Sequence, residues 1–260
     1  MAHLFIFGLG YTAKRIARLA TGSGWHISST GSDGDLDFEN RDSVLRMLGE
    51  ASHVLSSVPP DRERGIDPVL ANYGDALGGK WLGYLSSTGV YGDTDGAWVD
   101  ESAPIGTGRR TARAECDAAW LERGARVFRL PGIYGQGRSA FDRIAAGKAH
   151  RIDLPGQVFS RVHVDDIASG VLAALGGDAG AGAYNFSDDL PTSQNNVIEE
   201  ACRLLGVSPP LLKGIEEAGL SPMARGFYAE NRRVTNGKAK RVLGWQPNYS
   251  TYREGLLSLL

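Results

Sequence analysis

The sequence has little cysteine, no strong excess of charge and no long apolar run. Its two cysteines, Cys116 and Cys202, have no spacing to a partner, so we expect buried reduced thiols and neither a disulfide framework nor a metal site. With 28 basic and 30 acidic residues, the net charge of −2 gives no general attraction for nucleic acid or anionic membrane. The opening "MAHLFIFGLG" has neither the basic region of a signal peptide nor the length of a membrane span. We therefore expect a cytoplasmic protein that acts on small molecules, with no nucleic-acid, membrane or metal partner.

Glycine is plentiful by contrast, and short apolar runs alternate with longer segments of helical period. The 35 glycines are scattered at the ends of these segments, where tight turns are needed. The predicted strands are Leu4 to Phe7, Trp25 to Ser29, His53 to Ser57, Trp81 to Ser86, Arg126 to Leu130 and about Phe159 to His163. The predicted helices are about Thr12 to Ala20, Arg41 to Gly49, Gly65 to Leu77, Thr107 to Arg123 and Asp165 to Leu175. The alternation predicts an α/β fold with a Rossmann-type, doubly wound parallel sheet covered on both faces.

The pattern changes after Leu130, where the loops lengthen. One more sheet element is predicted at Gly182 to Phe186, and the closing helices are predicted at Ser193 to Leu205, Asn236 to Leu243 and Tyr252 to Leu260. We predict a Rossmann domain at 1–135, completed by about 158–187, with a small interleaved C-terminal lobe at 136–157 and 188–260. No linker rich in proline or serine separates the two parts, so we expect a shared cleft that holds the substrate.

The first twenty residues carry a dinucleotide-binding pattern. In "LFIFGLGYTAKRIARLA" an apolar strand meets the loop Gly8-Leu9-Gly10-Tyr11-Thr12-Ala13, and an amphipathic helix follows. Gly8 permits the tight turn, Gly10 lets the backbone approach a pyrophosphate, and Ala13 is small enough for the helix to pack on the strand. Tyr11 and Thr12 begin the helix, whose free N–H groups face the phosphates. We therefore predict that this loop binds NAD or NADP.

The end of the second strand, "HISSTGSDGD", bears on which dinucleotide is bound. An acidic residue here would bind the ribose 2′-hydroxyl of NAD, whereas donors favour the 2′-phosphate of NADP. Thr30 and Ser32 are such donors, no arginine is present, and Asp33 comes slightly late. The pattern leans weakly towards NADP and leaves NAD open. Ser57, at the end of the third predicted strand, is also expected at the cofactor.

Six segments resemble, in order, the NAD-dependent epimerase/dehydratase branch of the extended short-chain dehydrogenases/reductases. They are "FGLGYTA", "LSSTGVYGD", "FRLPGIYGQG", "RVHVDDIASGVLAAL", "YNFSDDLPTS" and "AKRVLGWQPNYSTYREGL". The resemblance implies a C-terminal lobe that holds a small molecule, typically a nucleotide sugar. It implies that Ser87 contacts the reacting hydroxyl or carbonyl of the substrate and that Thr88 lines the pocket. Tyr91 and Tyr134 belong to loops expected at the cleft, where such tyrosines mostly shape the substrate pocket and would less often act in proton transfer.

The family's acid–base pair, a tyrosine followed four residues later by a lysine, is missing. Counting back from Glu115 in "PIGTGRRTARAECDAAWLERG" places Thr107 at the tyrosine position and Thr111 at the lysine position. A threonine hydroxyl does not ionise usefully near neutral pH, so it cannot replace the phenol. Arg110, in the same predicted helix, either is solvated on an outer face or binds an anion of the cofactor or substrate.

Two functions remain open. One is an NAD(P)-dependent epimerase, dehydratase or reductase with non-standard or impaired acid–base chemistry. The other is a non-catalytic NAD(P)-binding sensor or regulatory module, like the NmrA-like relatives in this superfamily. Family members often pair helices across a dimer interface, so a homodimer is also open.

Overall fold

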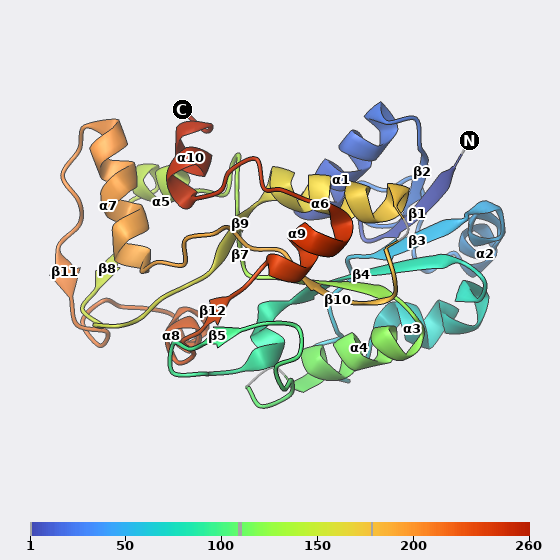
Figure 1. Ribbon diagram of the computed structural model, residues 1–260, viewed down its shortest axis with the longest axis horizontal. Helices are drawn as coiled ribbons and strands as arrows, with labels where there is room; N and C mark the ends of the chain where they lie inside the picture. The colour runs from blue at the N-terminus through green and yellow to red at the C-terminus, as the bar shows by residue number, and fades with distance from the viewer. Residues whose placement is uncertain (1, 109–110, 178) are drawn as a thin grey trace.

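Helices cover both faces of a central sheet in the computed structural model, and a small lobe lies beside it (Figure 1). The structure describes residues 2–108, 111–177 and 179–260. The sheet contains β1 (His3–Phe7), β2 (His26–Ser29), β3 (His53–Ser56), β4 (Trp81–Ser87), β6 (Arg126–Leu130) and β10 (Gly182–Asn185). The helices around it are α1 (Tyr11–Gly22), α2 (Arg41–Glu50), α3 (Pro68–Tyr73), α4 (Thr111–Glu122), α6 (Val164–Gly176) and α9 (Gly237–Leu243).

All neighbouring strands of this sheet run parallel, in the order β10-β6-β4-β3-β1-β2. The chain leaves β1 towards β2 on one side and continues from β3 on the other, so the winding reverses between β1 and β3. A crevice opens at the carboxyl ends of the strands at such a reversal, and ligands bind there. The predicted doubly wound parallel sheet is confirmed.

The two faces of the sheet have separate apolar cores because side chains alternate along each strand. Leu4 and Ile6 of β1 pack with Ile16 of α1, in the core that α6 and α9 complete. Phe5 and Phe7 of the same strand point to the other face, in the core formed with α2, α3 and α4.

Two predicted helices begin later than expected. The helix predicted from Gly65 is replaced by α3 and the short 3-10 helix η1 (Gly74–Leu77), because Asp67 caps the backbone N–H groups of Val69 and Leu70 ahead of Pro68. The helix predicted from Thr107 begins at Thr111 in the described part of the chain. Thr107 lies in the preceding loop.

The strand predicted at Phe159 to His163 is shorter and lies elsewhere. It forms β9 (Arg161–His163), which pairs in parallel with β7 (Gly132–Tyr134) outside the central sheet. Phe159 itself forms an antiparallel bridge with Thr192, which holds it away from the sheet.

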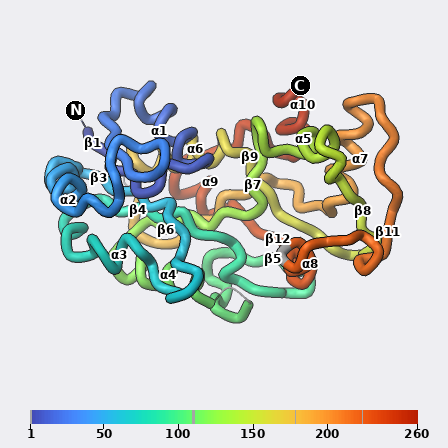
Figure 2. The backbone as a smooth tube through the Cα atoms, turned by 180° about the vertical axis from the view of Figure 1, so that it is seen from behind, coloured from blue at the N-terminus to red at the C-terminus, as the bar shows by residue number. Residues whose placement is uncertain are grey.

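The small lobe has its own core between three helices, α5 (Ala140–Ala145), α7 (Gln194–Leu205) and α10 (Tyr252–Leu257), which share buried side chains. The lobe also contains β8 (Arg151–Ile152), β11 (Leu212–Lys213) and α8 (Pro222–Tyr228), while β5 (Trp98–Val99) pairs with β12 (Arg233–Val234) at its border. Figure 2 shows from behind that these elements lie to one side of the sheet. Ala239 of α9 and Trp245 fall within the predicted lobe range 188–260 and are buried in the apolar core on one face of the central sheet. The domain boundaries stay a prediction.

Within the described part of the chain, no helix combines the length and the apolar character needed to cross a lipid bilayer.

Candidate functional site

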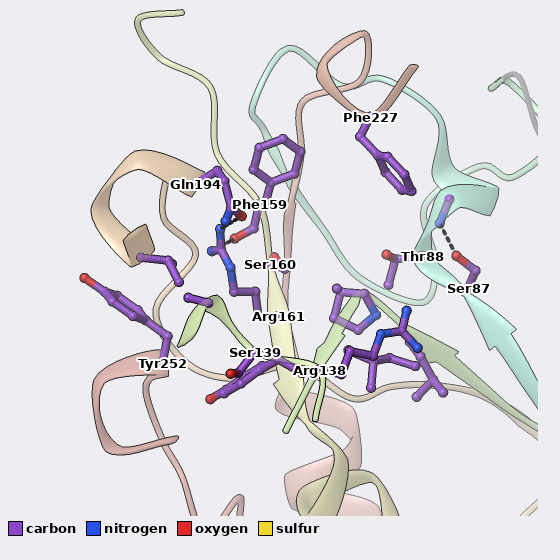
Figure 3. Close-up of a pocket in the computed structure, with 18 of the residues that line it drawn as sticks. Ser87, Thr88, Arg138, Ser139, Phe159, Ser160, Arg161, Gln194, Phe227 and Tyr252 are labelled. Carbon is purple, nitrogen blue, oxygen red and sulfur yellow. Dashed lines mark hydrogen bonds between the residues drawn. The ribbon is translucent and has the colours of Figure 1, made fainter. Parts of the chain in front are cut away.

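A cleft of about 870 Å³ lies between the carboxyl ends of the central strands and the small lobe. Its walls come from the start of α1, from the ends of β3, β4 and β6, and from α5, β9, α7, α8 and α10. Figure 3 shows one part of this cavity, with Ser87 and Thr88 on one side and Arg161, Gln194 and Tyr252 on the other. The cleft therefore joins the predicted cofactor loop to the predicted substrate lobe.

The glycine loop has the backbone geometry that a pyrophosphate site needs. Gly8 has a φ of +83°, and a Cβ there would lie 3.0 Å from Cγ2 of Val58. At Gly10 a Cβ would meet no atom within 4 Å, so the backbone faces open space. Gly10 is also the N-cap of α1, and no side chain caps its N–H groups. Because Gly10, Tyr11, Thr12 and Ala13 all line the cleft, this uncapped helix end fits a phosphate.

Two of the predicted cofactor residues, Ser57 and Thr30, support the loop from behind or beside it. The Ser57 hydroxyl donates to the Gly8 carbonyl and lines the cleft. The Thr30 hydroxyl accepts from the Gly8 N–H at 3.2 Å and is buried. Thr30 therefore fixes the conformation of the loop, and its side chain does not line the cleft.

The loop after β2 carries a charge pair. Lys14 forms an ion pair with Asp33, and this hydrogen-bonded contact lowers the pKa of the Asp33 carboxyl. Ser32 is exposed beside it. The sequence offered Thr30 and Ser32 as donors, with Asp33 slightly late, and the structure adds the Lys14 ammonium at the same point. The lean towards NADP stays a prediction.

Ser87 and Thr88 lie where β4 runs into the short 3-10 helix η2 (Thr88–Tyr91), and both line the cleft. The Ser87 hydroxyl accepts from the Gly89 N–H at 3.1 Å, so it caps η2 as well as facing the cavity (Figure 3). That bond uses the oxygen as acceptor, which leaves the hydroxyl proton for a ligand. The geometry brings Ser87 and Thr88 to the same cavity as Gly10.

Tyr91 points away from this cavity into a buried polar network. Its hydroxyl donates to Oδ1 of Asn185 at 2.7 Å and accepts from Nη1 of Arg129 at 3.0 Å. Burial raises the pKa of Tyr91. The structure therefore does not bring Tyr91 together with Ser87 and Thr88 in the cleft.

A buried ion pair beneath β4 completes this network. Arg129 of β6 donates to both carboxylate oxygens of Asp117 of α4, at 2.7 and 3.1 Å, and Ser86 donates to the same carboxylate at 2.6 Å. Both charged side chains are at most 3 % exposed. The pair anchors the end of β4 directly before Ser87. Sequence reasoning missed it, although a charge inside the apolar strand "RVFRL" was a usable signal for a buried partner.

Thr107 and Thr111, the residues expected at the acid–base positions, do not line the cleft. Thr107 donates its hydroxyl to the Tyr91 carbonyl at 3.0 Å, and Thr111 is the exposed first residue of α4. Arg110 lies outside the residues that the structure describes. Arg113, three residues after Arg110, does line the cleft and donates to the Tyr84 hydroxyl at 3.4 Å.

Tyr134 lies at the boundary between the two lobes. It lines the cleft, but its hydroxyl packs against Gly255 of α10, where a Cβ would lie 1.9 Å from the oxygen. Burial raises the pKa of Tyr134. Nearby, the buried carboxyl of Asp188 has a pKa raised by burial to about 7, even though Arg161 acts in the opposite direction.

Asp188 makes the stability of the fold depend on pH. Its carboxyl keeps a proton up to about pH 7 in the folded chain, whereas an unfolded chain releases it near 3.8. Folding therefore takes up a proton between these values, and the free energy of unfolding falls as the pH rises through this window. Between pH 5 and 7, we expect the free energy of unfolding of the wild type to fall by about 1 kcal/mol per pH unit relative to that of Asp188→Asn. Denaturant unfolding at each pH measures this difference. Parallel curves for the two proteins would contradict this assignment.

The lobe contributes lining residues that sequence reasoning did not select. These are Arg138, Arg143, Lys148, Phe159, Arg161 and Phe227. Phe159 and Arg161 fall in a predicted strand and the other four in segments with no predicted element, and nothing in the sequence marks any of the six as lining a cavity. Only the packing of α5, β9 and α8 around one cavity shows that they belong to the site.

The comparisons with known proteins agree with this architecture. No protein-family model matches the chain. A solved structure described as a functionally unknown conserved protein from Silicibacter pomeroyi DSS is 38% identical, with a TM-score of 0.88, and the match covers 100% of this chain and 98% of that one. A human epimerase family protein solved with NADPH has a TM-score of 0.78 at 14% identity, with 99% and 98% of the two chains covered.

A curated relative matches part of the chain. The 3-diazoavenalumate denitrifying reductase of a Streptomyces species is 29% identical over 179 residues, which is 61% of this chain. The match spans 58% of that reductase, so it covers less than two thirds of its length.

Proposed function

We propose that this chain is an NAD(P)-dependent reductase or epimerase-like protein. It belongs to the same family as the Silicibacter pomeroyi protein and has the fold of the extended short-chain dehydrogenases/reductases. The observation that carries the proposal is the uncapped N-terminus of α1 at Gly10, open to a cleft at the reversal of the sheet. The solved neighbour with NADPH and the Streptomyces reductase support it.

The chain's own residues would hold a dinucleotide along this wall. The backbone N–H groups of Tyr11 and Thr12 face the pyrophosphate, and Ser57 fixes the loop through the Gly8 carbonyl. The dinucleotide, when bound, donates or accepts a hydride. Ser87 and Thr88 then bind and orient the oxygen or nitrogen of a small molecule beside it, since both line the same cavity.

A reductase agrees better with this site than a proton-shuttling epimerase does. Threonines stand at the two positions where the family carries its tyrosine and lysine, so the chain supplies no phenol there. A reduction in which water supplies the proton can proceed without that phenol, although a positioned acid would add a factor of about 10² to 10⁴. The Streptomyces relative is described as a reductase.

Titration with NADPH and NADH tests the proposal. We expect saturable binding of at least one of them, followed by fluorescence of the reduced nicotinamide, because the cleft supplies the helix end and the open backbone of Gly10. Oxidation of the bound dinucleotide on addition of a carbonyl or other unsaturated acceptor would support the reductase. Binding of neither dinucleotide would overturn the proposal.

The non-catalytic sensor remains the second candidate. The observation that favours it is the bond from Thr107 to the Tyr91 carbonyl, which commits that hydroxyl to the loop. Dinucleotide binding with no oxidation by any acceptor would support this reading. The cytoplasmic location and the homodimer expected from the sequence also stay predictions.

A further inference from the structure

The part of the cleft that the small lobe forms, called here the lobe end, is lined by aromatic side chains. They are Phe159, Phe227, Tyr228 and Tyr252. Phe227 is 47 % exposed, and Figure 3 shows its ring pointing from α8 into the cavity. An apolar ring held open to a cavity is typical of a surface that a ligand covers.

Phe159 forms a fixed wall opposite this ring. The rings of Phe159 and Tyr228 meet edge to face, with centroids 5.5 Å apart at 86°. The guanidinium carbon of Arg161 lies 5.9 Å from the Phe159 centroid. Figure 3 shows Phe159 on the β9 side and Phe227 on the α8 side of the same part of the cavity. Ring surfaces on two sides favour a planar, apolar group between them.

A basic edge adjoins the aromatic wall. Nη2 of Arg143 donates to Nδ1 of His150 at 3.2 Å, and Nε2 of His150 lies 3.2 Å from the Tyr228 hydroxyl. A single imidazole therefore separates the guanidinium from the aromatic wall. Lys148 lines the same end.

These cations are not neutralised by the chain. Among the described residues, neither Arg143 nor Lys148 forms a salt bridge. The nearby carboxylate of Asp142 is used as the cap of α5, where it accepts from the Ser139 N–H at 2.7 Å and the Ser139 hydroxyl at 2.6 Å. A guanidinium fork beside an ammonium suits a carboxylate.

Two polar side chains at this end are partly used by the chain itself. The Ser160 hydroxyl accepts from the Val234 N–H at 2.9 Å and keeps its own proton, and Oε1 of Gln194 accepts from Arg161 at 3.3 Å and leaves the amide NH2 group. Sugar hydroxyls require several such partners, whereas an aromatic ring requires none. The lining therefore favours an aromatic acid over a sugar.

We propose that the lobe end of the cleft binds the substrate as a planar aromatic carboxylate. Its ring lies against Phe159 and Phe227, its carboxylate lies at Arg143 and Lys148, and its reacting end is directed towards Ser87 and Thr88. The assignment of this ligand as substrate rests on the proposed dinucleotide-dependent reduction.

Calorimetric binding of cinnamate, cinnamyl alcohol and UDP-glucose, with and without NADP⁺, tests this assignment. Cinnamyl alcohol has the same ring and no charge, so we expect it to bind at least about tenfold more weakly than cinnamate. Arg143→Met should weaken the binding of cinnamate by about tenfold and change the affinity for the alcohol by less than twofold. Phe227→Ala should weaken the binding of both ligands by about fivefold. Lys213→Met, a lobe lysine outside the cleft, is the matched control and should change neither.

Two other results would overturn the aromatic-acid assignment. Failure of cinnamate to bind, or tighter binding of UDP-glucose that Arg143→Met and Phe227→Ala both weaken, overturns the aromatic-acid assignment. NADPH binding measured on the same samples separates this failure from failure of the proposed function. If Arg143→Met lowers the unfolding temperature, Lys148→Met supplies the same comparison from the other cation.

Discussion

Gly10→Ala is expected to weaken dinucleotide binding by a factor of about 100 or more, which corresponds to ~2.7 kcal/mol. The added methyl group would meet no protein atom within 4 Å, so it would project into the space above the helix end. A pyrophosphate bound to the N–H groups of α1 needs the same space. The φ of −86° at Gly10 is accessible to alanine, so the fold should tolerate the change. Titration with NADPH, beside a denaturant unfolding curve, measures both effects.

Two further glycine variants serve as controls for this result. Gly22→Ala places its methyl group in open space at the other end of α1 and should leave NADPH affinity unchanged. Gly8→Ala should destabilise the fold, because its φ is +83° and the methyl group would lie 3.0 Å from Cγ2 of Val58. Unchanged NADPH affinity in Gly10→Ala would exclude the α1 end as the pyrophosphate site.

Asp117→Asn is expected to lower the free energy of unfolding by about 3–5 kcal/mol. The variant leaves the Arg129 guanidinium buried without its counter-charge, and it also weakens the acceptor of the Ser86 hydroxyl. The end of β4 and the Ser87 wall depend on these contacts. Urea unfolding followed by circular dichroism gives the change directly.

The matched control for this pair lies on the surface of α7. Glu200 and Arg203 form an ion pair three residues apart, in which the Arg203 side chain is 66% and the Glu200 side chain 16% exposed. Glu200→Gln should change the free energy of unfolding by less than about 0.5 kcal/mol. In the double variant Asp117→Asn with Arg129→Met, the loss should be smaller than the sum of the two single losses. A cost below about 1 kcal/mol for Asp117→Asn would show that water reaches the pair.

The sequence predicted the sheet and the cofactor loop because both depend on short-range rules. All six strands of the central sheet were predicted to within one residue at each end, because a short apolar run between turn residues in an α/β chain usually forms a buried strand. The conformation of the Gly8 to Ala13 segment was also predicted from the sequence, because the strand, the turn and the helix follow one another directly. The helix predicted at Asp165 to Leu175 likewise forms α6, with Asp165 and Asp166 in its first turn.

Errors arose where a distant contact competes with a local pattern. Thr107 fits a helical pattern, yet its bond to the Tyr91 carbonyl holds it in a loop. Phe159 fits a strand of the main sheet, yet its bridge to Thr192 holds it in the lobe. One hydrogen bond at Thr107 and two backbone hydrogen bonds between Phe159 and Thr192 outweigh a propensity of a few tenths of a kcal/mol per residue.

The sequence by itself determined the Rossmann sheet, the glycine loop, and the presence of Ser87 and Thr88 after a central strand. Tertiary structure alone decided the rest of the site. It turned Tyr91 into the interior, joined Asp117 to Arg129, and set Phe227 opposite Phe159 beside Arg143. The physical reason is that each of these contacts joins side chains from separate elements. Their distance depends on how whole elements pack, which no local pattern of residues encodes.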